Sequence, residues 1–183
     1  MPRPRVPSSA AMQDLSAPLT NRVAASGLLT LKLDTLAPTP PTHAFDLADY
    51  LWQGLALREK DFRAAVKAYD WSQAEGRTLC VYSSADAIIP RWAYMLVATA
   101  AGPHAAEVFV GTPAAYDAHV LAKAARDLDL EPYRDQRVVV KGCTDGRDPG
   151  AQAYATVTFR LRDVAKSVMY GEPCSTVPIF KRK

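Results

Sequence analysis

Segments with the pattern of a buried strand alternate along this chain with segments that have the period of a helix, and this alternation is its most constraining feature. Short runs rich in Val, Leu and Tyr predict strands over residues 28–34, 78–83, 107–110, 137–141 and 176–180. Apolar side chains spaced by three and four residues predict helices over residues 46–70, 90–102, 112–128 and 151–170. Strands that alternate with helices form a mainly parallel sheet. The sequence therefore predicts an α/β three-layer sandwich, with about five strands and helices on both faces of the sheet.

Two of these elements carry further expectations. The first helical segment is either one long helix or two helices with a turn near residues 55–60, because Gly54 weakens a helix interior and Asp61 can cap a new start. The last strand contains Pro178, which cannot donate a hydrogen bond to a neighbouring strand. We therefore expect that strand at an edge of the sheet.

The length and composition of the chain predict one folded domain. The chain has 183 residues, of which 49% are hydrophobic, and a chain of this size can bury a sufficient core without a metal or a disulfide. Residues 1–21 are rich in Pro, Ser and Ala and show no period, which predicts a disordered tail. We expect residues 22–183 to form a single α/β domain.

The charge of +3 lies at the two ends of the chain rather than in its body. Arginines near the start and the terminal sequence of residues 181–183 carry more positive charge than the whole chain, so the remainder is slightly acidic. A nucleic-acid groove needs Lys and Arg clustered on a folded face, so no nucleic-acid partner is expected. No run of 18 apolar residues predicts a membrane span, and no apolar segment after the first arginines predicts a secretory leader. We expect a cytoplasmic protein with free thiols.

The carboxyl ends of parallel strands select the candidate site, because ligands of open parallel sheets bind beyond those ends. The strand ending at residue 83 leads to Ser84 and Asp86, and the strand ending at residue 141 leads to Cys143 and Thr144. Glu172 and Cys174 precede the last strand. They share the edge with Cys143 only if that last strand runs antiparallel.

Thiols and a carboxylate at one edge are a set of metal ligands. Cys143, Cys174 and Asp86 are the candidate metal ligands, although zinc usually takes four ligands. Ser84, Thr144 and Glu172 are the polar candidates for holding a cofactor. The alternative for the loop cysteines is that they pack as small hydrophobic residues. The alternative for the loop of residues 84–86 is capping of the helix that follows.

The remaining Cys and His residues are expected to be structural. Cys80 lies inside a strand between two apolar residues, which predicts a buried thiol. His43, His104 and His119 form no ligand pair by their spacing. The sequence contains no GxGxxG, GxxxxGK[ST] or GxSxG motif and no CxxC pair. It therefore identifies no catalytic residue and no nucleotide site.

Five segments of the chain form a distinctive set: Gln53-Gly54-Leu55, Glu59-Lys60-Asp61-Phe62-Arg63, the segment from Ser84 to Met95, Val140-Lys141-Gly142-Cys143, and the segment from Gly171 to Pro178. Together they resemble the motifs of an uncharacterised bacterial family, domain of unknown function 2480. The resemblance covers residues 21–183 and implies no particular reaction. It implies a genomic context, because members of this family are often encoded near iron–sulfur cluster assembly proteins. Those proteins would then be partners, and zinc, iron or an iron–sulfur cluster would be the group handled.

Three functions follow as hypotheses. The first is an accessory protein of iron–sulfur cluster or metal handling that uses Cys143 and Cys174, with Asp86 as a further ligand. The second is an enzyme with Cys143 as a nucleophile or redox thiol. The third is a module that binds a partner protein through its strand-end loops and performs no chemistry. The distance between the two sulfur atoms would distinguish the first hypothesis from the others.

Overall fold

The structure is a computed structural model that describes residues 27–144, 146–172 and 175–183. The described residues form seven strands and four α-helices. The strands are β1 (Leu28–Leu31), β2 (Thr42–Asp46), β3 (Thr78–Tyr82), β4 (Glu107–Val110), β5 (Arg137–Lys141), β6 (Ser167–Glu172) and β7 (Ser175–Lys181). The helices are α1 (Glu59–Ala68), α2 (Arg91–Ala101), α3 (Pro113–Asp127) and α4 (Gly150–Leu161). Short 3₁₀ helices lie at Leu47–Tyr50, Trp71–Ala74 and Glu131–Tyr133.

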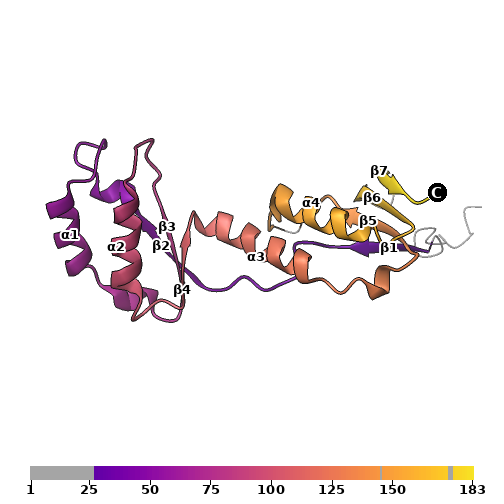
Figure 1. Cartoon of the computed structure of the whole chain (residues 1–183), viewed down its shortest axis with the longest axis horizontal. Coiled ribbons are helices and arrows are strands. Elements are labelled where there is room, and N and C mark those ends of the chain that lie inside the picture. Colours follow the sequence, from indigo (N-terminus) through magenta and orange to yellow (C-terminus); the bar gives the residue numbers. More distant parts are fainter. Residues whose placement is uncertain (1–26, 145, 173–174) are drawn as a thin grey trace, which may run out of the picture.

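The strands form two separate sheets. The first sheet has the order β1-β5-β6-β7, in which only β7 runs antiparallel to its neighbour. The second sheet has the order β2-β3-β4 and is wholly parallel. Figure 1 shows the two sheets at opposite ends of an elongated molecule, with α3 and the segment of residues 32–41 running between them.

The core of the first sheet lies between β5 and the pair of helices α3 and α4. Val138 and Val140 point to the same face of β5, and both are buried against this pair of helices. Alanines on the facing sides of the two helices, such as Ala122 and Ala153, are also buried. Small side chains let two helix backbones approach closely, so α3 and α4 form a tight layer over this sheet.

The core of the second sheet is aromatic. Phe45 of β2 stacks on Tyr50 at 5.1 Å and on Trp71 at 5.4 Å between ring centroids. Phe62 of α1 contacts Tyr50 edge to face at 5.5 Å. Such pairs add about 0.5–1.5 kcal/mol each beyond the area that they bury. These rings join α1, β2 and the two 3₁₀ helices at Leu47–Tyr50 and Trp71–Ala74 into one cluster.

Helix α3 contacts both sheets. Near its first turn, the Tyr116 hydroxyl donates to Glu107 of β4 at 2.8 Å and accepts from Thr78 of β3 at 3.0 Å. Its later turns pack along α4 over the first sheet. Thr112 caps this helix by accepting from the Ala115 amide at 3.2 Å, and Pro113 is its first residue. The helix predicted over residues 112–128 is thus confirmed.

The α/β class and most of the strands are confirmed, but the sheet differs from the prediction. The sequence predicts one sheet of about five strands, whereas seven strands form two sheets. The expected edge position of the strand with Pro178 is confirmed, because β7 ends the order of the first sheet. The first helical segment is interrupted, since a 3₁₀ turn at Leu47–Tyr50 precedes α1.

One predicted helix boundary is wrong, and the sequence did not predict β2. The helix expected to run to residue 170 ends at Leu161, and residues 167–172 form β6. Val164 and Val168 continue the helical spacing, yet Val168 pairs with Val138 of β5 and is buried there. Strand β2 follows a proline-rich segment and has too few residues to show a period. Its pairing with β3 decides its conformation.

The predicted tail of residues 1–21 lies outside the described residues. Within the described part of the chain, none of the helices combines the length and apolar character needed to cross a membrane.

Candidate site at the carboxyl end of the first sheet

Cys143 lies directly beyond β5, where the ends of β5 and β6 meet. The backbone amide of Cys143 donates to Oε1 of Glu172 at 3.3 Å, and the Gly142 amide donates to the Gly171 carbonyl at 3.3 Å. The Cys143 thiol is exposed to solvent. The loop after β5 and the end of β6 therefore form one surface that presents a thiol next to a carboxylate.

Two glycines let the chain segments of this site approach each other. A Cβ atom on Gly142 would lie 2.9 Å from the Tyr170 ring. Gly171 has a φ of +125°, and a Cβ atom there would lie 2.5 Å from the Ser175 carbonyl oxygen. Side chains at these positions would push apart the strand ends that hold Cys143 and Glu172 together.

An apolar groove lies over β5 and β6, and Val140 is its lining residue nearest in sequence to Cys143. It has a volume of about 540 Å³ and is lined by side chains of β5, α4, β6 and β7. Tyr154 lines it and donates its hydroxyl to the Lys141 carbonyl at 3.2 Å, while the Tyr170 ring meets Tyr154 at 5.6 Å. Burial raises the pKa of Tyr154, and the neighbouring Tyr170 adds to this effect. The groove wall is thus anchored to the two residues that precede Cys143.

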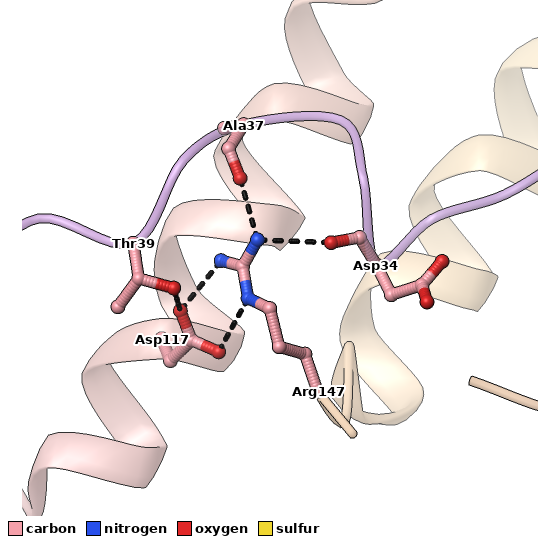
Figure 2. A network of polar contacts seen from close by, with 5 residues as sticks. All are labelled: Asp34, Ala37, Thr39, Asp117 and Arg147. Carbon is pink, nitrogen blue, oxygen red and sulfur yellow. Dashed lines mark hydrogen bonds and ion pairs between the residues drawn. The ribbon is translucent and has the colours of Figure 1, made fainter. Parts of the chain in front are cut away.

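Arg147 anchors the far end of the Cys143 loop (Figure 2). Its guanidinium donates to both carboxylate oxygens of Asp117 in α3, at 2.6 and 3.0 Å. The same group donates to the carbonyls of Asp34 and Ala37 at 2.9 and 2.6 Å. Thr39 completes the network by donating to Asp117 at 2.9 Å. A planar, five-donor cation thereby ties the Cys143 loop to α3 and to the segment that leads from β1 to β2.

Ser84 and Asp86 lie elsewhere, at the carboxyl end of the second sheet. The Ser84 amide donates to Asp46 at 3.0 Å, and the same carboxylate oxygen accepts from the Ala48 amide at 2.9 Å. Burial raises the pKa of Asp46, but these hydrogen bonds from Ser84 and Ala48 outweigh it and the pKa is lowered. Asp86 is exposed. Neither residue caps α2, whose N-cap is Pro90 and has no side-chain bond.

The structure brings together some of the predicted site residues and separates others. Cys143 and Glu172 are in contact, and the half-buried Thr144 follows in the same loop. Ser84 and Asp86 follow a strand of the other sheet. Cys174 lies outside the described residues, although its flanking residues Glu172 and Ser175 pair across β6 and β7. Among the described residues, no three Cys, His, Asp or Glu side chains are grouped closely enough to hold a metal.

Cys80 and the three histidines have the structural roles that the sequence predicts. Cys80 is fully buried in β3, and this burial raises the pKa of its thiol. His43 bonds the Tyr69 hydroxyl at 2.7 Å, and His104 contacts Glu75 at 2.9 Å. His119 packs against the Phe109 ring at 5.5 Å.

The sequence did not reveal the Arg147 network. Arg147 stands in a short loop, a common position for a solvated cation, and Asp117 lies on a helix that begins near the other sheet. The acceptors of Arg147 lie 30, 110 and 113 residues away along the chain. No local pattern relates residues at such separations.

Comparisons with known proteins place the chain in a family. Searches of curated proteins and of solved structures returned no significant match. The model of the family described as Protein of unknown function (DUF2480) matches residues 17–182, which include the Cys143 loop and the β6–β7 hairpin. Because this match covers nearly the whole chain, the protein belongs to the DUF2480 family.

Proposed function

We propose that this protein is an accessory factor of metal or iron–sulfur cluster handling, and that it holds its cargo transiently with the thiols of Cys143 and Cys174. The supporting observation is the hydrogen bond from the Cys143 amide to Glu172. It joins the Cys143 loop to residue 172, two positions before Cys174 in the sequence. The antiparallel direction of β7 meets the condition under which both cysteines belong to one edge.

The chemistry of this donor set suits transfer better than storage. Thiolates bind soft metals such as zinc and iron, and the Glu172 carboxylate is a third donor next to Cys143. A structural zinc site would need four protein ligands. An incomplete, solvent-exposed set leaves coordination positions for a donor or acceptor protein, such as the iron–sulfur assembly proteins proposed as partners. A reducing cytoplasm would keep both thiols available.

Metal analysis of protein purified without oxygen tests this proposal. The wild type is expected to carry zinc or iron. The Cys143→Ser, Cys174→Ser double variant is expected to bind about tenfold less metal. The Cys80→Ala variant is the control, because Cys80 is buried in β3 and its loss should leave the metal content unchanged. Equal metal content in the wild type and the double variant would sink the proposal.

The apolar groove supports a second candidate, an enzyme that uses Cys143 as a nucleophile. The groove volume falls within the range of small-molecule sites, about 300–1,000 Å³, and its wall touches the residues before the exposed thiol. The candidate requires a small apolar substrate to extend from this groove past Lys141 to the Cys143 thiol.

Alkylation kinetics separate this candidate from the first. A nucleophilic thiol reacts as a thiolate, so Cys143 is expected to react with iodoacetamide at pH 7 about tenfold faster in the folded protein than in the urea-unfolded chain. Tyr154→Trp places a larger side chain in the groove wall. It should change the rate of Cys143 alkylation only if the reagent binds in the groove before it reacts. Equal rates in the folded and unfolded chains would remove the support for an enzyme.

A further inference from the structure

The two sheets each end on a short parallel strand that pairs on one side only. Within the described residues, β1 pairs with β5 alone, and both β4 and β2 pair with β3 alone. The residue of β2 beside Val81 is Phe45, which is buried, so β4 is the edge of the second sheet that is considered further. β1 and β4 have four residues each, and neither contains proline or lysine. Natural edge strands are usually protected by such residues, as β7 is by Pro178 and Lys181. β1 and β4 therefore lack proline and lysine, and their remaining protection is their short length and, in β4, the charge of Glu107.

Each of these edges exposes an apolar side chain on the face that carries helices. Val110 of β4 is 61% exposed, and it pairs with Val81, which is buried under α1 and α2. Leu29 of β1 is 37% exposed, and it pairs with Val138, which is buried under α3 and α4. The two edges thus match each other, because each has an exposed apolar side chain on the face of its sheet that the helices cover.

The two edges of one chain are held apart by α3. This helix has 15 residues and is about 22 Å long. Tyr116 bonds it to the second sheet, while Arg147 and α4 bind it to the first. Figure 1 shows β1 and β4 on opposite sides of this helix. Among the described residues, neither of these edges can therefore complete the other within one chain.

We propose that a second copy of this chain completes both edges, with β4 of each copy pairing in parallel with β1 of the other around a twofold axis. This dimer contains two continuous sheets of the order β2-β3-β4-β1-β5-β6-β7, each built from halves of both chains. Right-handed crossovers place α2 and α4 on the same face of such a sheet. Val110 of one copy then lies beside Leu29 of its partner, and both exposed side chains become buried.

The dimer also unites the two halves of the site that the sequence predicts. In one chain, Ser84 follows β3 of the second sheet and Cys143 follows β5 of the first. In the joined sheet, all six parallel strands end at one edge, so Ser84 of one copy and Cys143 of the other line the same edge. This inference does not depend on the proposed metal chemistry.

Light scattering coupled to size-exclusion chromatography tests the dimer with charged substitutions at the two edges. The full wild-type chain is expected to elute with the mass of two chains. Val110→Lys and Leu29→Glu each place a charge in the proposed junction, so each is expected to raise the dissociation constant of the dimer at least about tenfold. Circular dichroism should show folded monomers, because both side chains are exposed within one chain.

An equal mixture of the two variants is the decisive measurement. In the mixed dimer, one junction sets the lysine introduced by Val110→Lys beside the glutamate introduced by Leu29→Glu, and the other junction is wild type. Because the opposite charges attract, the mixture is expected to recover the mass of two chains. A misfolded variant would not be rescued in this way. Val177→Lys on β7 is the matched control, since Val177 is 58% exposed, and it should leave the dimer intact.

Three outcomes would overturn this inference. The first is a wild-type chain that is monomeric at all accessible concentrations. The second is a dimer that survives Leu29→Glu but not Val110→Lys, which indicates pairing of β4 with β4. The third is a dimer lost with Val177→Lys, which indicates that β7 forms the interface.

Discussion

At the scale of single residues, the contact that organises the molecule is that of Arg147 with Asp117. Arg147 bonds a carboxylate and two carbonyls, and these acceptors belong to α3 and to the segment after β1. The Arg147 and Asp117 side chains are only 24% and 17% exposed. Removing one partner of such a partly buried pair is expected to lower the free energy of unfolding strongly, because the other partner is left without its hydrogen bonds.

The Asp117–Arg147 pair predicts a specific dependence of stability on pH. The hydrogen bonds from Arg147 lower the pKa of Asp117 against the opposing effect of burial, and Thr39 contributes to the lowering. The folded chain therefore binds fewer protons than the unfolded chain near pH 4. The stabilisation is complete above the unfolded pKa and is lost as pH falls through the folded pKa. Asp117→Asn should lower the free energy of unfolding by about 1.5–3 kcal/mol at pH 7. It should also reduce the loss of stability that the wild type shows as the pH falls below about 4.

Urea unfolding between pH 2.5 and 7 measures this effect. Asp135→Asn is the control, because Asp135 also pairs with an arginine, Arg182, but is 71% exposed. Its cost should be about 0.5 kcal/mol or less. If the Asp117→Asn protein lost stability at acidic pH as the wild type does, the Asp117–Arg147 pair would not be the cause of this pH dependence.

At the scale of elements, the β6–β7 hairpin carries one side of the candidate site. The hairpin has a register shift near Met169. Its first strand, β6, ends at the edge where Glu172 meets Cys143, and β7 runs antiparallel away from that edge. Its glycine at position 171 has a backbone conformation that other residues rarely adopt, next to the backbone of Ser175. Substitution of Gly171 by any residue with a Cβ atom is therefore expected to destabilise the hairpin.

Gly171→Ala is expected to destabilise the hairpin. The new Cβ would lie against the Ser175 carbonyl oxygen, which is backbone and cannot rotate away. Together with the strained φ, this should cost about 2 kcal/mol or more in urea unfolding and lower the metal content of the protein. Gly146→Ala is the control, since Gly146 also has a positive φ but its Cβ would meet open space. Equal losses in the two variants would show that the close contact has no effect.

At the scale of the whole molecule, the main feature is the division of the strands into two separate sheets. Each sheet has its own core, and α3 connects the two. The proposed dimer joins a sheet from each chain into one mainly parallel sheet of seven strands, which differs from the predicted sandwich because α2 and α4 lie on the same face. In such an assembly, the edge that carries Cys143 also carries Ser84 of the partner copy.

Local sequence alone was enough to predict the α/β class, the positions of β3, β4, β5, α2 and α3, and the family. These features depend on periodicity, caps and motifs, which neighbouring residues decide. The sequence also led correctly to Cys143 at a strand end and to Cys80 in the core. The strand conformation of β2 and β6 depends instead on tertiary contacts, because their pairing partners outweigh a weak or misleading period. The separation of Asp86 from Cys143, the contact of Glu172 with Cys143 and the Arg147 network were likewise decided by long-range pairing, which no spacing in the sequence encodes.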